Sequence, residues 1–158
     1  MGCDIHGVFQ VSNEGEWETI NSPYNWERDY LLFGFLAGVR ERNVYCLGEP
    51  RGIPDDFPVF FQHEMPYHIL KPEMKYRKLY GENVISMGEH SLGWFTFKEI
   101  FEGRQKFIDR QNEIESNYPG YLKFYWYLDY FFNQLEETMQ MCGVEDKSRY
   151  RMVFGFDS

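Results

Sequence analysis

The chain has 158 residues, and its 25 acidic residues outnumber its 16 basic residues, giving a formal net charge of −9. Binding to the phosphate backbone of long nucleic acids depends on Lys and Arg, so this charge disfavours bulk DNA or RNA binding. Aromatic side chains make up 20% of the residues, and a chain so rich in them is expected to fold. Length and composition therefore predict one domain over residues 1–158.

Hydropathy and cysteine content indicate the cellular compartment in which the protein is expected. No apolar stretch approaches the ~20 residues of a membrane-spanning helix. The N-terminal segment lacks the basic and apolar regions of a signal peptide. The three cysteines, Cys3, Cys46 and Cys142, are scattered and odd in number, which favours a reducing compartment over a disulfide framework. We expect no membrane association and a cytoplasmic location.

The chain opens with the pattern of a β-hairpin. Residues Cys3–Ser12 have the pattern of a strand. One face of this strand would carry Cys3, Ile5, Gly7, Phe9 and Val11, and the other Asp4, His6, Val8 and Gln10. A turn at 13–15 then leads into a second short strand, Glu16–Ile20. Residues 21–25 are expected to form a loop.

The middle of the chain is less regular. Residues Arg28–Val39 are apolar nearly all round, which is typical of a buried helix. Gly and Pro make 40–56 a loop, and two prolines leave 57–69 ambiguous. Residues 71–80 suit either a short helix or a mobile insertion, and 83–89 either a strand or a loop. Residues 57–82 as a whole are interpreted as a variable insertion.

Helical signals return in the last third of the chain. Thr96 and Glu99 form a capping-box pattern, so a helix is expected from Phe97 to about Glu115. The apolar spacing of 121–142 predicts a long helix that ends at Gly143. Tyr150–Phe156 alternates like a strand. We therefore predict an α+β fold in which a small antiparallel sheet, the N-terminal hairpin plus the C-terminal strand, packs against about three helices.

Asp4 and His6 are the first residues with a pattern suited to chemistry. Alternate residues of a strand point the same way, so the pair can hold a divalent metal or act as a carboxylate–imidazole couple. A similar Asp-x-His-Gly opens metallophosphoesterases, but the rest of that signature is absent. Asp157 would lie near the pair if the last strand runs beside the first. A purely structural role for Asp4 and His6 is the alternative.

A second candidate is the Gly-flanked segment that carries His90, Ser91 and Trp94. It is expected to be a loop just before a helix, where a phosphate can bind near the first helical turn. Capping and core roles for these side chains are equally well supported.

Two arginines are further candidates for ligand binding. Pro50, Gly52 and Pro54 surround Arg51 in a stiff loop, and a fixed guanidinium suits phosphate recognition. In so acidic a chain, an internal ion pair of Arg51 is slightly the more favoured role. Arg28 stands at the start of the expected buried helix, beside Asp29, whose charge complements the helix dipole.

Five sequence blocks recur together in a group of small bacteriophage and prophage proteins that have no established activity. The blocks are Met1–His6, Arg28–Phe33 with Leu36–Arg40, Pro50–Asp55, His90–Trp94 and Arg151–Asp157. The chain resembles this group from end to end, whereas 57–82 carries no part of the resemblance. The resemblance implies a phage-encoded, intracellular protein.

From these patterns we expect the protein to bind a phosphorylated, nucleotide-like small molecule, to sequester or hydrolyse a host defence signal. Hydrolysis would be of the phosphodiesterase type, either metal-dependent or by acid–base catalysis. The expected site residues are His6 and His90 for catalysis; Arg28, Arg51, Ser91 and Trp94 for ligand binding; and Asp4, His6, His90 and Asp157 for a divalent metal. The alternative is a protein that inhibits a host protein through an acidic, aromatic surface. Formation of a homo-oligomer is left open.

Overall fold

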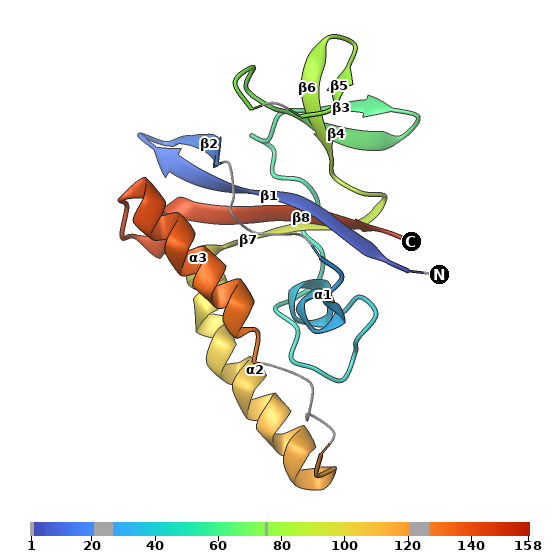
Figure 1. The fold of residues 1–158 in the computed structure, drawn as a ribbon, viewed down its shortest axis with the longest axis vertical. Coiled ribbons are helices and arrows are strands. Elements are labelled where there is room, and N and C mark those ends of the chain that lie inside the picture. The colour runs from blue at the N-terminus through green and yellow to red at the C-terminus, as the bar shows by residue number, and fades with distance from the viewer. Residues whose placement is uncertain (1, 21–26, 75, 121–126) are drawn as a thin grey trace.

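The first and last strands of the chain pair at the centre of an antiparallel sheet (Figure 1). The computed structural model describes residues 2–20, 27–74, 76–120 and 127–158. In spatial order, the first sheet consists of β2 (Glu16–Ile20), β1 (Asp4–Asn13), β8 (Tyr150–Asp157) and β7 (His90–Thr96). The predicted hairpin and closing strand are confirmed. The register runs from Asp4 opposite Asp157 to Val11 opposite Tyr150, so both chain ends lie at one edge.

Three helices cover one face of this sheet. They are α1 (Tyr30–Ala37), α2 (Phe97–Asn117) and α3 (Asp129–Cys142), and a short 3₁₀ turn, η1 (Lys147–Arg149), precedes β8. Asp29 caps α1 by accepting hydrogen bonds from the backbone N–H groups of Leu31 and Leu32. The capping box of Thr96 and Glu99 begins α2 as predicted. No helix among the described residues combines the length and apolar character that crossing a bilayer requires.

The long helix predicted over 121–142 is confirmed only for its second part. Leu128 has a φ of +59°, a left-handed conformation that cannot continue a helix, and α3 begins after it. Residues 121–126, like the loop predicted at 21–25, lie outside the described residues. At the other end, Gly143 adopts the left-handed conformation expected of a C-terminal cap.

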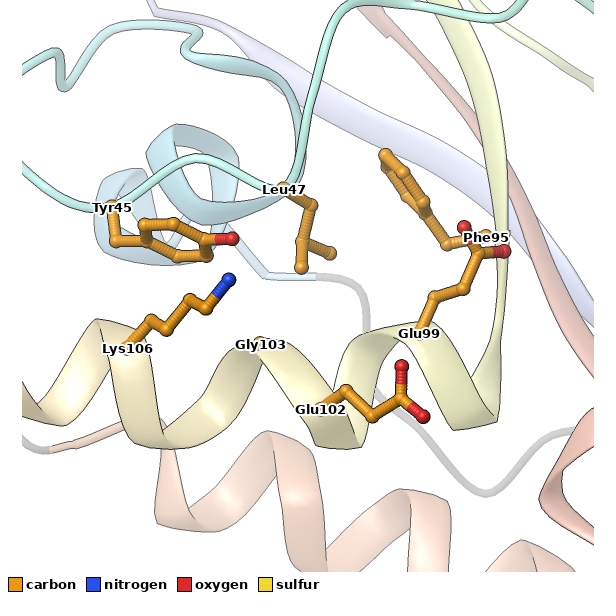
Figure 2. A pocket seen from close by; sticks show the side chains of 7 residues that line it. All are labelled: Tyr45, Leu47, Phe95, Glu99, Glu102, Gly103 and Lys106. Carbon is orange, nitrogen blue, oxygen red and sulfur yellow. The ribbon is translucent and has the colours of Figure 1, made fainter.

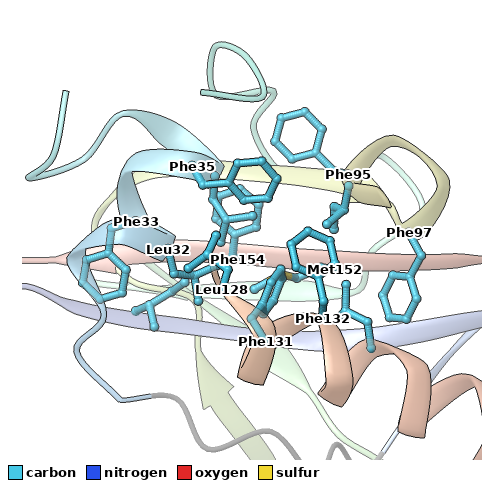
Figure 3. Close-up of a cluster of buried hydrophobic side chains, with 14 of the residues drawn as sticks. Leu32, Phe33, Phe35, Phe95, Phe97, Leu128, Phe131, Phe132, Met152 and Phe154 are labelled. Atoms are coloured by element: carbon cyan, nitrogen blue, oxygen red, sulfur yellow. The ribbon is translucent and has the colours of Figure 1, made fainter. Parts of the chain in front are cut away.

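The main hydrophobic core lies between the helices and the first sheet (Figure 3). Phenylalanines dominate it and make edge-to-face contacts, such as Phe35 with Phe107 at 5.2 Å between ring centroids and Phe33 with Phe156 at 5.1 Å. Because α1 is surrounded by this core, its apolar residues are buried on all sides.

A second antiparallel sheet covers the other face of the first. Its spatial order is β3 (Val59–Gln62), β4 (Met65–Ile69), β6 (Glu82–Ser86) and β5 (Lys78–Leu79). A smaller apolar cluster joins the two sheets, with Val8 and Val153 from the first packed near Phe57 and Met87. The fold is therefore one α+β domain with a sheet that the sequence did not indicate.

Two local expectations in this region are corrected. Of the two alternatives for 71–80, the short helix is not formed: residues 72–73 make a turn and Lys78–Leu79 form β5, because the backbone of Arg77 and Lys78 pairs with β6 and not within a helical turn. The loop expected at 89–94 is mostly β7, with a register shift between His90 and Gly93. The sequence does not show this strand clearly, because the backbone is irregular at Ser91, whose φ is +52°, and the alternation of side chains between the two faces is interrupted there. Variability of 57–82 stays a prediction.

Candidate functional site

Four of the predicted site residues meet at the edge of the first sheet where β1 begins and β8 ends. Asp4 and His6 project from β1, Asp157 from β8, and Arg28 from the segment before α1. Asp4 and Asp157 are register partners, and Gly155 lies opposite His6, so the side chains share the face of the sheet away from the helices. The long-range pairing of the chain ends is what brings them together.

His6 and Asp157 form a close side-chain contact within this group. His6 Nε2 lies 2.6 Å from Asp157 Oδ2, and the two side chains are 28% and 34% exposed. When His6 is neutral, donation from Nε2 to the carboxylate places the imidazole lone pair on Nδ1. The pair can therefore accept a proton from a bound molecule, as the sequence pattern predicted for a carboxylate–imidazole couple.

Arg28 and Asp4 form a second pair beside the first. Arg28 Nε lies 2.5 Å from Asp4 Oδ1, and Nη2 lies 3.2 Å from Oδ2, which is a two-point contact. This hydrogen bonding with Arg28 holds the pKa of the Asp4 carboxyl below its ordinary value. The guanidinium crosses over Gly2, where a Cβ atom would collide with it.

His90 and Ser91 lie on the neighbouring strand but do not join the group. His90 is the register partner of Phe156, which faces the helices, so His90 and His6 project from opposite faces of the sheet. The His90 ring stacks near the Phe156 ring and contacts Ser91 Oγ through Nδ1 at 3.0 Å and Ser158 Oγ through Nε2 at 3.3 Å. The pleat therefore separates the two histidines proposed as catalytic partners.

Arg51 and Trp94 are brought together elsewhere, on the outside of α2. Both guanidinium nitrogens Nη1 and Nη2 contact the carboxylate of Glu99, and the guanidinium lies 5.0 Å from the centroid of the Trp94 ring. Hydrogen bonding with Arg51 lowers the pKa of Glu99, which also closes the capping box of α2. The internal ion pair considered for Arg51 is thus present.

The residues predicted to bind a divalent metal do not converge on one point among the described residues. Within residues 2–20, 27–74, 76–120 and 127–158, no group of three or more His, Cys, Asp or Glu side chains is placed to hold a metal ion. Asp4 and Asp157 are each engaged by a neighbouring side chain, and His90 faces the other way.

A buried series of hydrogen-bonded side chains joins the two sheets, and the sequence did not predict it. Arg151 Nε donates to Gln10 Oε1 at 2.8 Å, and Gln10 Nε2 donates to Thr19 Oγ1 at 3.1 Å. Thr19 Oγ1 lies 2.7 Å from His68 Nε2, and His68 Nδ1 lies 2.9 Å from the Pro58 carbonyl oxygen. A carbonyl only accepts, so His68 Nδ1 carries the proton and Thr19 donates to Nε2.

Arg151 is the most deeply buried charge of this chain of hydrogen bonds. Its side chain is 3% exposed, and Nη1 lies 2.8 Å from Asp56 Oδ1. The guanidinium lies 4.2 Å from the centroid of the Trp17 ring, whereas Nη2 has no hydrogen-bond partner among the described residues. The available signal was a polar residue between apolar neighbours, Gln10 between Phe9 and Val11 and Arg151 between Tyr150 and Met152, but nothing in the sequence indicated that the two would pair.

A small pocket of about 190 Å³ lies beside α2 (Figure 2). Leu47 and Tyr45 close one side of it, and Gly103 lets their loop approach the helix because a Cβ atom there would collide with Leu47. Lys106 Nζ lies 5.8 Å from the centroid of the Tyr45 ring. The charged groups on its rim have partners within the chain, Glu99 with Arg51 and Glu102 with Lys98.

Comparison with known proteins found no matching family model, no matching curated protein and no matching solved structure.

Proposed function

We propose that this chain is a phage-encoded, intracellular protein that binds a phosphorylated, nucleotide-like small molecule at the polar edge of the first sheet. The observation that carries the proposal is the 2.6 Å contact between His6 and Asp157 beside the two-point pair of Arg28 and Asp4. These side chains come from the first, second and last of the five recurring blocks, which are far apart in sequence. Their convergence supports a shared role.

The donors at this edge suit a phosphate group. Arg28 uses Nε and Nη2 to contact Asp4, and its remaining Nη1 donor can take a phosphate oxygen. His6 adds a second donor at Nδ1 when it is protonated, while Asp157 holds the ring in place. The two carboxylates fix the directions of the two donors, which reduces the ordering cost of binding.

Titration calorimetry against mononucleotides, dinucleotides and cyclic nucleotides tests the proposal. We expect binding by at least one of them and a loss of about tenfold or more in affinity in Arg28→Gln and in His6→Gln. The matched control is Arg110→Gln, which removes an exposed arginine that pairs with Glu113 on α2, far from the site in sequence. Absence of binding across the whole panel contradicts the proposal.

Turnover is a separate question for the same site. If the bound molecule is hydrolysed, His6 Nδ1 is the proton acceptor available at this edge, and Asp157 orients it. Chromatography of the products would then show turnover in the wild type, and its loss in His6→Gln at saturating ligand. Unchanged turnover in His6→Gln would remove His6 from the reaction.

A second candidate function follows from the helical side of the molecule. Exposed Tyr130 and Met141 on α3 stand among acidic residues such as Glu136 and Glu137. Such a surface fits the alternative of a protein that inhibits a host protein. Affinity capture from host lysate tests it, with Tyr130→Ser/Met141→Ser expected to lose a partner that the wild type retains. Equal capture by both proteins would count against it.

A further inference from the structure

Charge is distributed unevenly between the two halves of the fold. Residues 57–86, which form the second sheet and are called the second-sheet lobe here, contain four basic and three acidic residues. The rest of the chain contains 12 basic and 22 acidic residues, so its formal charge is −10, whereas that of the lobe is +1. The lobe is therefore the part of the surface that repels a polyanion least.

The same lobe carries three of the four most exposed aromatic side chains among the described residues. Tyr80 is 80% exposed, Phe61 is 65% exposed and Tyr76 is 60% exposed. Exposed rings of this size have no role in the core, and several together on one lobe mark an interaction surface. Arg77 and Lys78 are exposed in the same stretch, next to Tyr76 and close to Tyr80 in sequence.

Ring contacts order part of this surface. Phe60 on β3 stacks with Tyr67 on β4 at 5.6 Å between centroids, and Tyr80 meets Phe60 edge-on at 6.3 Å. Gln62 Nε2 donates to the Tyr80 hydroxyl at 3.3 Å, which ties the turn after β5 to β3. Tyr80 is thus held in place by neighbours while most of its ring remains open to solvent. A preordered ring loses little freedom when another ring stacks on it.

We propose that the second-sheet lobe binds a short single strand of nucleic acid, with bases stacked on Tyr80 and Tyr76 and phosphates near Arg77 and Lys78. Phe61 is not part of this platform, because it lies between Phe60 and Gln62 on β3 and faces the other side of the strand from Tyr80. Stacking platforms interleaved with basic side chains are the means by which proteins bind single strands without sequence preference. A duplex does not present its base faces, so it is excluded. The negative net charge argued against bulk nucleic-acid binding, but the acidic excess lies in residues outside this lobe.

This site is distinct from the polar edge of the first sheet, so it stands or falls independently of the nucleotide proposal. The probe is a fluorescein-labelled oligothymidylate of about ten nucleotides, and the readout is fluorescence anisotropy at low salt. We expect Tyr80→Ala to weaken binding about tenfold and Tyr80→Phe to retain it, because the phenyl ring still stacks. The matched control is Tyr118→Ala, which removes another highly exposed tyrosine, 68% exposed, at the end of α2.

Charge and competition experiments complete the test. Lys78→Glu should weaken binding and reduce its dependence on salt concentration, and a duplex of the same length should not compete. Circular dichroism confirms folding of each variant, and the exposure of Tyr80 and Lys78 makes unfolding unexpected. Failure of the wild type to bind the oligonucleotide overturns the proposal, as does binding that Tyr80→Ala leaves unchanged. Capture of a protein partner that depends on Tyr80, without oligonucleotide binding, also overturns it.

Discussion

Thr19 Oγ1 lies 2.7 Å from His68 Nε2, and this hydrogen bond joins β2 of the first sheet to β4 of the second. The same histidine stacks on Phe57 at 3.9 Å between ring centroids and contacts the Pro58 carbonyl through Nδ1. With Nδ1 donating to Pro58, neutral His68 accepts from Thr19 at Nε2, and burial together with the positive charge of Arg151 disfavours a second proton on the ring.

The first prediction concerns acid. Burial lowers the pKa of His68 from its ordinary value of 6.5. Below about pH 6.5, His68 binds a proton in the unfolded chain but stays neutral in the folded protein. The free energy of unfolding therefore falls as the pH falls, by up to about 1.4 kcal/mol per pH unit from this group. Urea denaturation between about pH 7.5 and 5.5 measures it. His68→Gln should flatten this dependence, whereas His63→Gln, at an exposed position, should not.

The second prediction concerns an exposed acid that acts on a buried charge. Asp56 is 57% exposed, yet its carboxylate is the counter-ion of Arg151. Burial lowers the pKa of the Arg151 guanidinium, and the hydrogen bond with Asp56 opposes that effect. Asp56→Asn should therefore destabilise the fold by about 1–3 kcal/mol, more than a surface substitution usually does.

The neighbour Asp55 supplies the control for Asp56. Asp55→Asn changes the same charge at an exposed position in the same turn, and it should change stability by less than about 0.5 kcal/mol. Thermal unfolding of the two variants side by side gives the comparison. Equal effects would mean that Asp56 acts only through the net charge of the protein.

A third prediction separates structural from ligand-binding roles for Arg51. Because its guanidinium is held by Glu99 and lies over Trp94, Arg51→Met should cost roughly 0.5–1 kcal/mol of stability and leave nucleotide affinity unchanged. A double-mutant cycle with Glu99→Gln measures the coupling directly. A loss of nucleotide binding in a folded Arg51→Met protein would restore the ligand-binding role that its rigid loop suggested.

The fourth prediction concerns close backbone approach at Gly155. A Cβ atom on Gly155 would collide with the carbonyl oxygen of Met87, so Gly155→Ala must push the 86–89 segment away from β8. We expect a loss of at least about 3 kcal/mol, or failure to fold. At Gly48 the nearest atom to an added Cβ is 3.9 Å away, so Gly48→Ala should be tolerated. The denaturation midpoints of Gly155→Ala and Gly48→Ala, each compared with that of the wild type, test this prediction.

Local signals account for the parts of the fold that were predicted well. The capping box of Thr96 and Glu99 and the glycine at 143 act within a few residues of where they stand, so the start of α2 and the end of α3 follow from the sequence. The alternation of β1 also placed Asp4 and His6 on one face without any knowledge of the neighbours. The second sheet was missed because its strands are short and interrupted by prolines, and because their pairing is stabilised by packing against Val8 and Val153.

The candidate site shows the same division. The sequence by itself supplied candidate residues with suitable chemistry, and its strand periodicity put Asp4 and His6 on the same face. Only the tertiary structure decided their partners, because register across β1, β8 and β7 sets which face a side chain occupies: Asp157 joins His6, whereas His90 points to the helices. Charge behaves differently, because the lobe is one continuous segment: the sequence alone places most acidic residues outside 57–86, and only the structure shows that this segment forms a separate sheet.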